Sequence, residues 1–247
     1  MTNFRMIKPR LYGAIGYKPY FDYTYLALDY FLRIYNKQKF TPLNYYEFGT
    51  GKGGSLIEFL KSLRRLLKVS LYEKIALETG INIVLFDSFE GLPDPKSTRD
   101  VTPFHSKGSY ALSEENIRKL VNDYSRHINP KPQIMVVKGY YEDTLTESLN
   151  EKFKAFPPSF VNVDVDYYSS ATTVLNFIAP ICQNGTVFYF NNIFEHLGNL
   201  NKGEYAAISE FNNNNKIYHL FPYRIFTISE YVNRVFTMHK LNVNEHA

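Results

Sequence analysis

Two aspartates separated by a single residue end an apolar segment of the chain, "SFVNVDVD" (159–166). In a β-strand, side chains two residues apart point to the same side, so Asp164 and Asp166 are expected to converge. Two converging carboxylates repel each other unless a cation, a proton or a hydrogen-bond donor lies between them. Such a pair is unusual as a purely structural feature, so it indicates a functional site.

A glycine-rich turn, "EFGTGKGGS" (47–55), is the second candidate. Gly49, Gly51 and Gly54 fit the pattern G-x-G-x-x-G between a strand-like and a helix-like segment. Glycines let the backbone turn tightly and approach a ligand closely before the N-terminus of a helix. The turn does not end in Gly-Lys-Ser/Thr, which excludes a P-loop, whereas NAD, FAD and S-adenosylmethionine all stay compatible with it.

Asp87 ends the apolar run "INIVLFD" (81–87), where an acidic side chain can accept hydrogen bonds from both ribose hydroxyls of a nucleoside. It lies 33 residues after Gly54, whereas the dinucleotide fingerprint places its acidic residue about 20 residues after the last glycine. Glu73 is nearer to that spacing, but it falls in a helical segment. The longer gap argues against NAD.

The run "VFYFNN" (187–192) ends in two neutral amides, Asn191 and Asn192. We expect them beside the aspartate pair, because the carboxyl ends of parallel strands meet at one edge of a sheet. Weaker candidates for acid–base chemistry or for closing over a ligand are His105, Glu195 and His196. For the two histidines, a surface or loop position is the simpler interpretation.

Strand-like and helical segments alternate five times, which predicts an α/β fold with a mostly parallel, doubly wound sheet. The predicted strands are 43–48, 81–87, 132–139, 159–166 and 186–192, with two further β-like stretches at 216–223 and 234–240. The predicted helices are 23–35, the segment after the glycine turn, 113–128 with Ser113 as N-cap, 143–153, 169–182 and 204–215.

The 247 residues carry a net charge of +4, and 45% of them are hydrophobic, which is enough for one large α/β domain or two small ones. The one basic cluster, "KSLRRLLK" (61–68), fits a solvated helix face, so nucleic acid is not favoured as a partner. Cys182 is the only cysteine, which excludes an intrachain disulfide. A cytoplasmic protein is expected, because the N-terminus lacks a signal-peptide pattern and no apolar run is long enough to span a bilayer.

Taken together, these segments resemble the macrocin-type O-methyltransferases, a family of class I S-adenosylmethionine-dependent enzymes. The resemblance covers about residues 43–215 and is carried by "YEFGTGKGGS", "FDSFEGLPDP", "VKGYYEDTL" and "VDVDYYSSATTVLNFIAPICQNGTVFYFNN". It implies a Rossmann-like fold with a mostly parallel seven-stranded sheet and an antiparallel C-terminal hairpin. Residues 43–247 would form the methyltransferase domain. Residues 1–42 are dense in aromatic side chains, and their helical segment 23–35 is expected to pack on the core or to form a cap or lid over a substrate, two roles that are compatible.

The resemblance also implies roles for individual residues. Those expected to bind the cofactor are Glu47, Gly49, Thr50, Gly51 and Ser55 around its methionine part, Asp87 and Ser88 at the ribose, and Gly139, Tyr140 and Tyr141 at the adenine. The first aspartate of the D-x-D motif, Asp164, would help to bind a divalent metal, and the second, Asp166, would be the general base.

The chain departs from the family pattern at the fifth strand. Where the family completes its metal site with an acidic pair, this chain has Asn191 and Asn192. The set with Asp164 then presents one formal negative charge where the family pattern presents three, so Mg²⁺ would be held much more weakly. We therefore do not expect the reaction to depend on magnesium.

The sequence predicts an S-adenosylmethionine-dependent O-methyltransferase that acts on a small polar acceptor. By resemblance, the acceptor would be a sugar hydroxyl of a glycoside, a natural product or a polysaccharide precursor. Two alternatives stay open: a non-catalytic or metal-independent relative that keeps the nucleoside site, and a nicotinamide-dependent oxidoreductase. The expected partners are small molecules, with no nucleic acid and no membrane, and self-association into a homo-oligomer is left open.

Overall fold

The computed structural model describes residues 23–35, 42–193, 195–223 and 235–241. Within them, seven strands form one sheet in the order β3-β2-β1-β4-β5-β7-β6. The strands are β1 (Leu43–Phe48), β2 (Ile81–Asp87), β3 (Gln133–Lys138), β4 (Phe160–Val163), β5 (Thr186–Phe190), β6 (Tyr218–Pro222) and β7 (Val235–Lys240). The first five are parallel, and β7 runs antiparallel to both β5 and β6, which confirms the predicted Rossmann-like sheet and its C-terminal hairpin.

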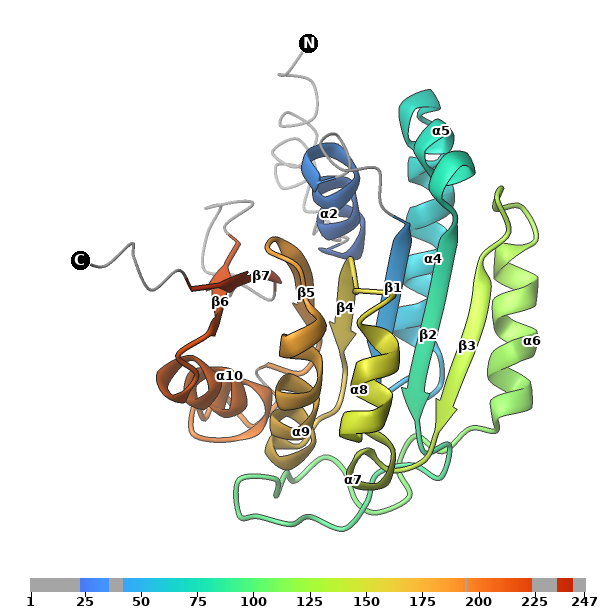
Figure 1. Cartoon of the computed structure of the whole chain (residues 1–247). Helices are drawn as coiled ribbons and strands as arrows, with labels where there is room; N and C mark the ends of the chain where they lie inside the picture. The colour runs from blue at the N-terminus through green and yellow to red at the C-terminus, as the bar shows by residue number, and fades with distance from the viewer. Residues whose placement is uncertain (1–22, 36–41, 194, 224–234, 242–247) are drawn as a thin grey trace, which may run out of the picture.

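Helices cover both faces of this sheet (Figure 1). One apolar core contains buried residues of α2, α4, α5 and α6, and the other contains buried residues of α8, α9 and α10. The helices are α2 (Tyr23–Tyr30), the π-helical η1 (Phe31–Tyr35), α4 (Gly54–Leu66), α5 (Ser70–Thr79), α6 (Glu114–Ser125), α7 (Tyr141–Thr144), α8 (Glu147–Phe153), α9 (Tyr168–Ile178), the 3₁₀-helical η2 (Ala179–Ile181) and α10 (Gly203–Asn214).

Helix α4 shows why the pattern of the sequence produces this packing. Its apolar residues recur three and four positions apart and are buried against the sheet, while the basic cluster 61–68 presents its lysines and arginines to solvent. The prediction of a solvated basic face is therefore confirmed. Ser113 likewise caps α6 as predicted, because its hydroxyl accepts a hydrogen bond from the backbone N–H of Asn116 at 3.3 Å.

Strand β4 and one predicted helix differ from the expectation in ways that affect the site. Strand β4 ends at Val163, so Asp164 and Asp166 follow the strand instead of lying within it. The helix expected over 143–153 is broken at residues 145–146 into α7 and α8. The break has a local cause, because the hydroxyl of Thr146 accepts the N–H of Leu149 and starts a new helix.

The predicted N-terminal cap lies mostly outside the described residues. Of its described part, Ala27, Leu28, Phe31 and Leu32 are buried in the core shared with α4. Whether the segment also covers a ligand stays a prediction. Among the described residues, no helix is long and apolar enough to cross a membrane.

Candidate functional site at the strand ends

The residues that follow four neighbouring strands are aligned in one row. Strand order reverses between β1 and β4, where the chain crosses from one half of the sheet to the other. The N–H of Gly49 donates to the carbonyl of Phe86 (3.0 Å), and the N–H of Asp164 to that of Phe48 (2.9 Å). In the same way, the N–H of Asn191 donates to the carbonyl next to Asp164 in sequence, at 2.9 Å. The four strand ends therefore deliver their polar groups to one edge, as the sequence predicts.

The glycine turn depends on its lack of side chains. Gly49 has φ +82°, and a Cβ built on it would lie 1.9 Å from the carbonyl oxygen of Asp164, far inside contact distance. Gly53 has φ +79° at the N-cap of α4. Between them, the buried hydroxyl oxygen of Thr50 has no hydrogen-bond partner among the described residues. A buried hydroxyl without a partner is costly, which fits a turn shaped to receive a polar ligand.

Glu47, the second-last residue of β1, places a fully buried carboxylate beneath this turn. It accepts hydrogen bonds from the hydroxyls of Tyr45 and of Ser55, the latter at 3.1 Å. Burial raises the pKa of the Glu47 carboxyl to about 8, and the charges of Asp164 and Asp87 act in the same direction. A cationic group of a ligand bound above the turn would be stabilised by this carboxylate.

Asp87 holds the glycine turn against the end of β2. Its Oδ2 accepts the N–H groups of Thr50 (2.7 Å) and Gly51 (3.0 Å), and its Oδ1 accepts the N–H of Phe89 (2.6 Å). A carboxylate offers about four acceptor positions, so one is left for a ligand hydroxyl. Asp87 is thus an organiser of the turn, which is compatible with a second role in binding a ligand.

The residues expected near the ribose and the adenine lie around the ends of β2 and β3. The hydroxyl of Ser88 donates within its own loop, to a backbone carbonyl at 3.2 Å. The N–H of Gly139 donates to the backbone carbonyl of Asp87 at 3.0 Å, which brings the two strand ends together. Tyr140 and Tyr141 follow as the N-cap and first residue of α7. This group therefore lies beside Asp87, on the far side of the turn from the aspartate pair.

Asp164 is bound by both asparagine side chains. The amino group of Asn191 donates to its Oδ2 at 2.9 Å, and that of Asn192 donates to its Oδ1 at 2.7 Å. The amino group of Asn192 also donates to Oδ1 of Asp166 at 2.8 Å and so links the two aspartates. Burial raises the pKa of Asp164 to about 6, although the two amide hydrogen bonds oppose this shift.

The aspartates converge, but not for the reason given by strand geometry. Asp166 lies beyond β4 with φ +56°, in the left-handed region, and 5% of its surface is exposed. Burial and the neighbouring charges of Asp164 and Glu195 raise its pKa to about 8. Behind it, the fully buried carboxylate of Glu204 accepts the backbone N–H groups of Val165 (3.3 Å) and Asn192 (2.9 Å). The side chain of Glu204 therefore fixes the path of both loops.

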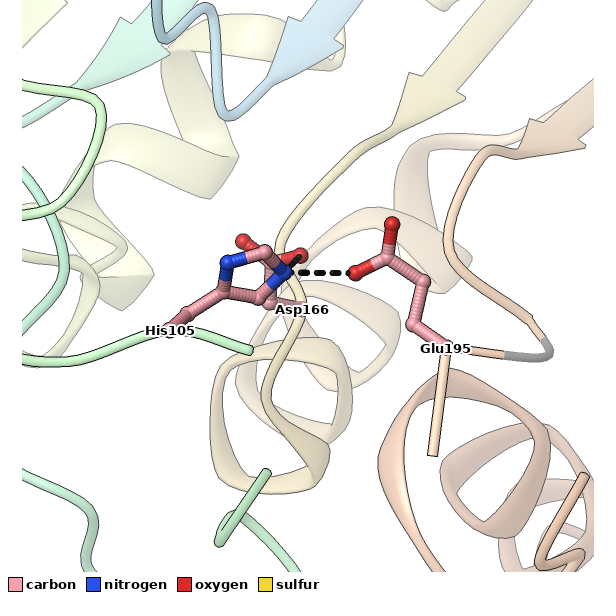
Figure 2. Close-up of side chains that lie close together, drawn as sticks. All are labelled: His105, Asp166 and Glu195. Atoms are coloured by element: carbon pink, nitrogen blue, oxygen red, sulfur yellow. Dashed lines mark hydrogen bonds and ion pairs between the residues drawn. The ribbon is translucent and has the colours of Figure 1, made fainter. Parts of the chain in front are cut away.

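His105 and His196 lie in loops, as expected, but neither is a surface residue. The side chain of His105 is 13% exposed, and its Nε2 lies 2.9 Å from Oε2 of Glu195 and 3.8 Å from Oδ1 of Asp166 (Figure 2). His196 is buried, and its Nε2–H donates to the backbone carbonyl of Asp166 at 3.0 Å. The ring that meets Glu195 is therefore His105, 90 residues away in sequence, and not its neighbour His196.

Comparison with protein families decides which enzymes this arrangement belongs to. Residues 38–222 match the family described as macrocin O-methyltransferase, TylF. The chain belongs to this family. Its members transfer a methyl group to oxygen from S-adenosylmethionine, which is therefore the cofactor, and the buried Thr50 hydroxyl and the open glycine turn fit such a ligand.

Solved structures agree with this fold. The calicheamicin methyltransferase CalS11 is similar with a TM-score of 0.59 and 19% identity, covering 87% of this chain and 77% of its own. The O-methyltransferase NovP is similar with a TM-score of 0.57 and 16% identity, covering 89% of this chain and 79% of its own. At these identities the likeness establishes the shared fold. No curated protein matches the chain.

The residues at the family's metal position do not fit a magnesium ion. Both oxygens of Asp164 already accept amino groups, and the carbonyl oxygen of Asn191 accepts the hydroxyl of Tyr189 at 3.3 Å. The amino group of Asn192 lies between the two aspartates, where a cation would otherwise separate their charges. A neutral hydrogen-bond donor thus takes the place of the ion.

Sequence reasoning missed two residues of this site, Glu204 and Tyr110, and it did not predict that His105 would contact Glu195. Glu204 is the second residue of α10, and a glutamate in the first turn of a helix is ordinarily solvated. Tyr110 contacts Nδ1 of His105 through its hydroxyl at 2.9 Å, and burial raises its pKa to about 12. Each belongs to a segment without a motif, so only spatial proximity identifies it.

Proposed function

We propose that the chain transfers the methyl group of S-adenosylmethionine to a hydroxyl of a small polar acceptor. The observation that carries this proposal is the row of strand ends, which joins the Asp87-bound glycine turn to the Asp164–Asp166 pair. The glycine turn bound by Asp87 suits a nucleoside cofactor, and the pair of aspartates suits an acceptor group that loses a proton. The resemblance to macrocin O-methyltransferases supports a sugar of a glycoside, natural product or polysaccharide precursor as the acceptor.

The cofactor-binding roles in this proposal follow the positions along the edge. Glu47, Gly49, Thr50, Gly51 and Ser55 would contact the methionine part, Asp87 and Ser88 the ribose, and Gly139, Tyr140 and Tyr141 the adenine. The buried carboxylate of Glu47 supports its role, because a cationic amino group would stabilise its ionised form. The free acceptor position of Asp87 supports contact with a ribose hydroxyl.

The chain's own groups must align the acceptor and remove its proton. S-adenosylmethionine, when bound, supplies an activated methyl group whose sulfonium sulfur leaves with the bonding electrons. Asp166 would accept the proton of the acceptor hydroxyl as the new C–O bond forms, because its raised pKa suits a base near neutral pH. Asp164, held by two amides, would orient the acceptor and keep Asp166 in place.

Binding and turnover can be separated by variants of the two halves. Calorimetry with S-adenosylhomocysteine should show binding to the wild type and to Asp166→Asn, whereas a methyl-transfer assay over a panel of glycosides and sugar nucleotides should detect product only with the wild type. Binding of NADH without S-adenosylhomocysteine would overturn the proposal in favour of an oxidoreductase. Cofactor binding with no transfer to any acceptor would favour the non-catalytic alternative.

Three finer expectations accompany this function. We expect the protein to work in the cytoplasm on small molecules and not on nucleic acid, because its net charge of +4 is mild and its basic cluster is a solvated helix face. We also expect residues 1–42 to contribute to acceptor choice. Exchange of this segment with that of a relative should then change the preferred acceptor without changing affinity for S-adenosylhomocysteine.

A further inference from the structure

We propose that His105, Asp166 and Glu195 form a site for one divalent transition-metal cation such as Zn²⁺. The site lies next to the position that Asn192 fills, and it uses a different set of ligands from the family pattern. Its role in methyl transfer rests on the proposed function, but cation binding itself does not. Three observations support it: the distances, the balance of charge and the chemistry of the ligand atoms.

The three ligand atoms lie close enough for one ion. Nε2 of His105, a carboxylate oxygen of Asp166 and one of Glu195 all lie within 4.8 Å of one another, and the two contacts of the ring measure 2.9 and 3.8 Å. Ligand atoms about 2.0–2.2 Å from a tetrahedral Zn²⁺ lie about 3.3–3.5 Å apart. The observed distances bracket that value, so small side-chain movements would complete the coordination. Figure 2 shows that the three side chains meet from three separate segments.

The excess of acidic groups in the cluster favours the binding of a cation. Among the described residues, no lysine or arginine forms an ion pair with Asp166 or Glu195, and the imidazole of His105 is the basic group that faces both. The amino group of Asn192 donates to Asp166, but it is neutral and leaves the carboxylate charge uncompensated. The carboxyl groups of Asp164, Asp166 and Glu195 lie close together here, and acidic groups gathered in this way repel one another when ionised. A divalent ion would offset two of these charges.

The imidazole of His105 is the nitrogen ligand of the set. Its Nε2 faces Glu195 and Asp166, and the hydroxyl oxygen of Tyr110 lies beside both ring nitrogens, 2.9 Å from Nδ1 and 3.2 Å from Nε2. Imidazole nitrogen together with carboxylate oxygen favours a transition metal such as Zn²⁺ over Mg²⁺, which prefers oxygen ligands alone.

The loop that carries His105 is fixed to the rest of the fold. Asp100 accepts the N–H groups of Lys96 and Ser97, both at 2.9 Å, and that of Ser169 at 2.8 Å at the start of α9. The N–H of Gly203 in α10 donates to a carbonyl of the same loop at 3.2 Å. The ligands are therefore preorganised on anchored segments. Three protein ligands leave a further coordination position, which an acceptor hydroxyl could occupy while the second oxygen of Asp166 stays free for its proton.

The test measures Zn²⁺ binding to the full-length protein after treatment with a chelator. Calorimetry should show that the wild type binds one equivalent of Zn²⁺. Co²⁺ added in its place should absorb visible light more strongly when bound to the protein than it does in water. His105→Gln and Glu195→Gln should each weaken Zn²⁺ at least about tenfold. His127→Gln is the matched control, because His127 is exposed after α6 and should leave binding unchanged. Cooperative urea unfolding of each variant verifies that it is folded.

Three results would overturn the site: no Zn²⁺ binding by the wild type, full binding by both His105→Gln and Glu195→Gln, or an equal loss in His127→Gln. The outcome is independent of the proposed function. Zn²⁺ binding without methyl transfer would support the site while the function failed. Methyl transfer without Zn²⁺ binding would support the function and remove the site.

Discussion

Asp87→Asn tests whether one carboxylate both builds the glycine turn and binds the cofactor. The three backbone N–H groups of Thr50, Gly51 and Phe89 point at its two oxygens, at 2.7, 3.0 and 2.6 Å. Asparagine keeps the size of the side chain but replaces one acceptor oxygen with an amino group. In its best orientation it keeps the bonds to Thr50 and Gly51 and turns a donor toward the N–H of Phe89.

The cost follows from these contacts. A hydrogen bond to a charged group contributes about 1.5–3 kcal/mol, and a neutral one about 0.5–1.5 kcal/mol. Loss of the Phe89 bond and weakening of the two others should therefore lower the free energy of unfolding by about 3–5 kcal/mol. Affinity for S-adenosylhomocysteine should fall at least about tenfold, because the turn loosens and a ribose hydroxyl loses a charged partner.

Urea unfolding and calorimetry measure the two effects separately. Asp123→Asn is the matched control: its carboxylate forms a surface ion pair with Arg126 at 3.2 Å, so its removal should change stability by no more than about 1 kcal/mol. If Asp87→Asn unfolds within 1 kcal/mol of the wild type, the hydrogen-bond accounting is refuted. If the variant is destabilised but binds S-adenosylhomocysteine normally, Asp87 is only an organiser of the turn.

Gly49→Ala should prevent folding or lower the free energy of unfolding by more than about 3 kcal/mol in a urea titration, because the new Cβ would overlap the carbonyl of Asp164. Gly54→Ala is the control: Gly54 lies in open space at the start of α4, so this change should leave stability unchanged or raise it slightly. The rate of methyl transfer should rise with pH and level off above about 8, as Asp166 loses its proton, and a flat profile between pH 6 and 9 would contradict its role as base. Because its pKa is raised in the folded state, Asp166 should also lower stability progressively as pH rises from about 4 to 8, and Asp166→Asn should flatten that part of the curve.

Several features of the fold were predictable because they depend on local physics. The run 81–87 forms β2 over the predicted residues, since a short, continuous apolar segment of this kind is typical of a buried parallel strand. Ser113 caps α6 because its side chain needs only a neighbour three residues away. The edge that carries the site was predictable in the same way, since parallel strands must end at one side of the sheet.

For the aspartate pair, the sequence predicted the correct position but gave the wrong structural reason. Asp164 and Asp166 were expected to converge as alternate residues of a strand, but β4 ends at Val163 and Asp166 adopts a left-handed conformation. They meet because the amino group of Asn192 bonds to both. The substitution of an acidic pair by asparagines was visible in the sequence, but its consequence, an amide in the place of an ion, depends on which way the side chains point.

The sequence by itself determined the sheet, the glycine turn and the membership of a methyltransferase family, because apolar periodicity, glycine conformations and short motifs act over a few residues. The tertiary structure decided which polar groups meet. His105 and Glu195 are 90 residues apart, and Glu204 lies in a helix that gives no sign of a site. Their proximity follows from long-range packing of loops onto α9 and α10, which no local pattern encodes. For that reason the cluster in Figure 2 was beyond the reach of sequence reasoning.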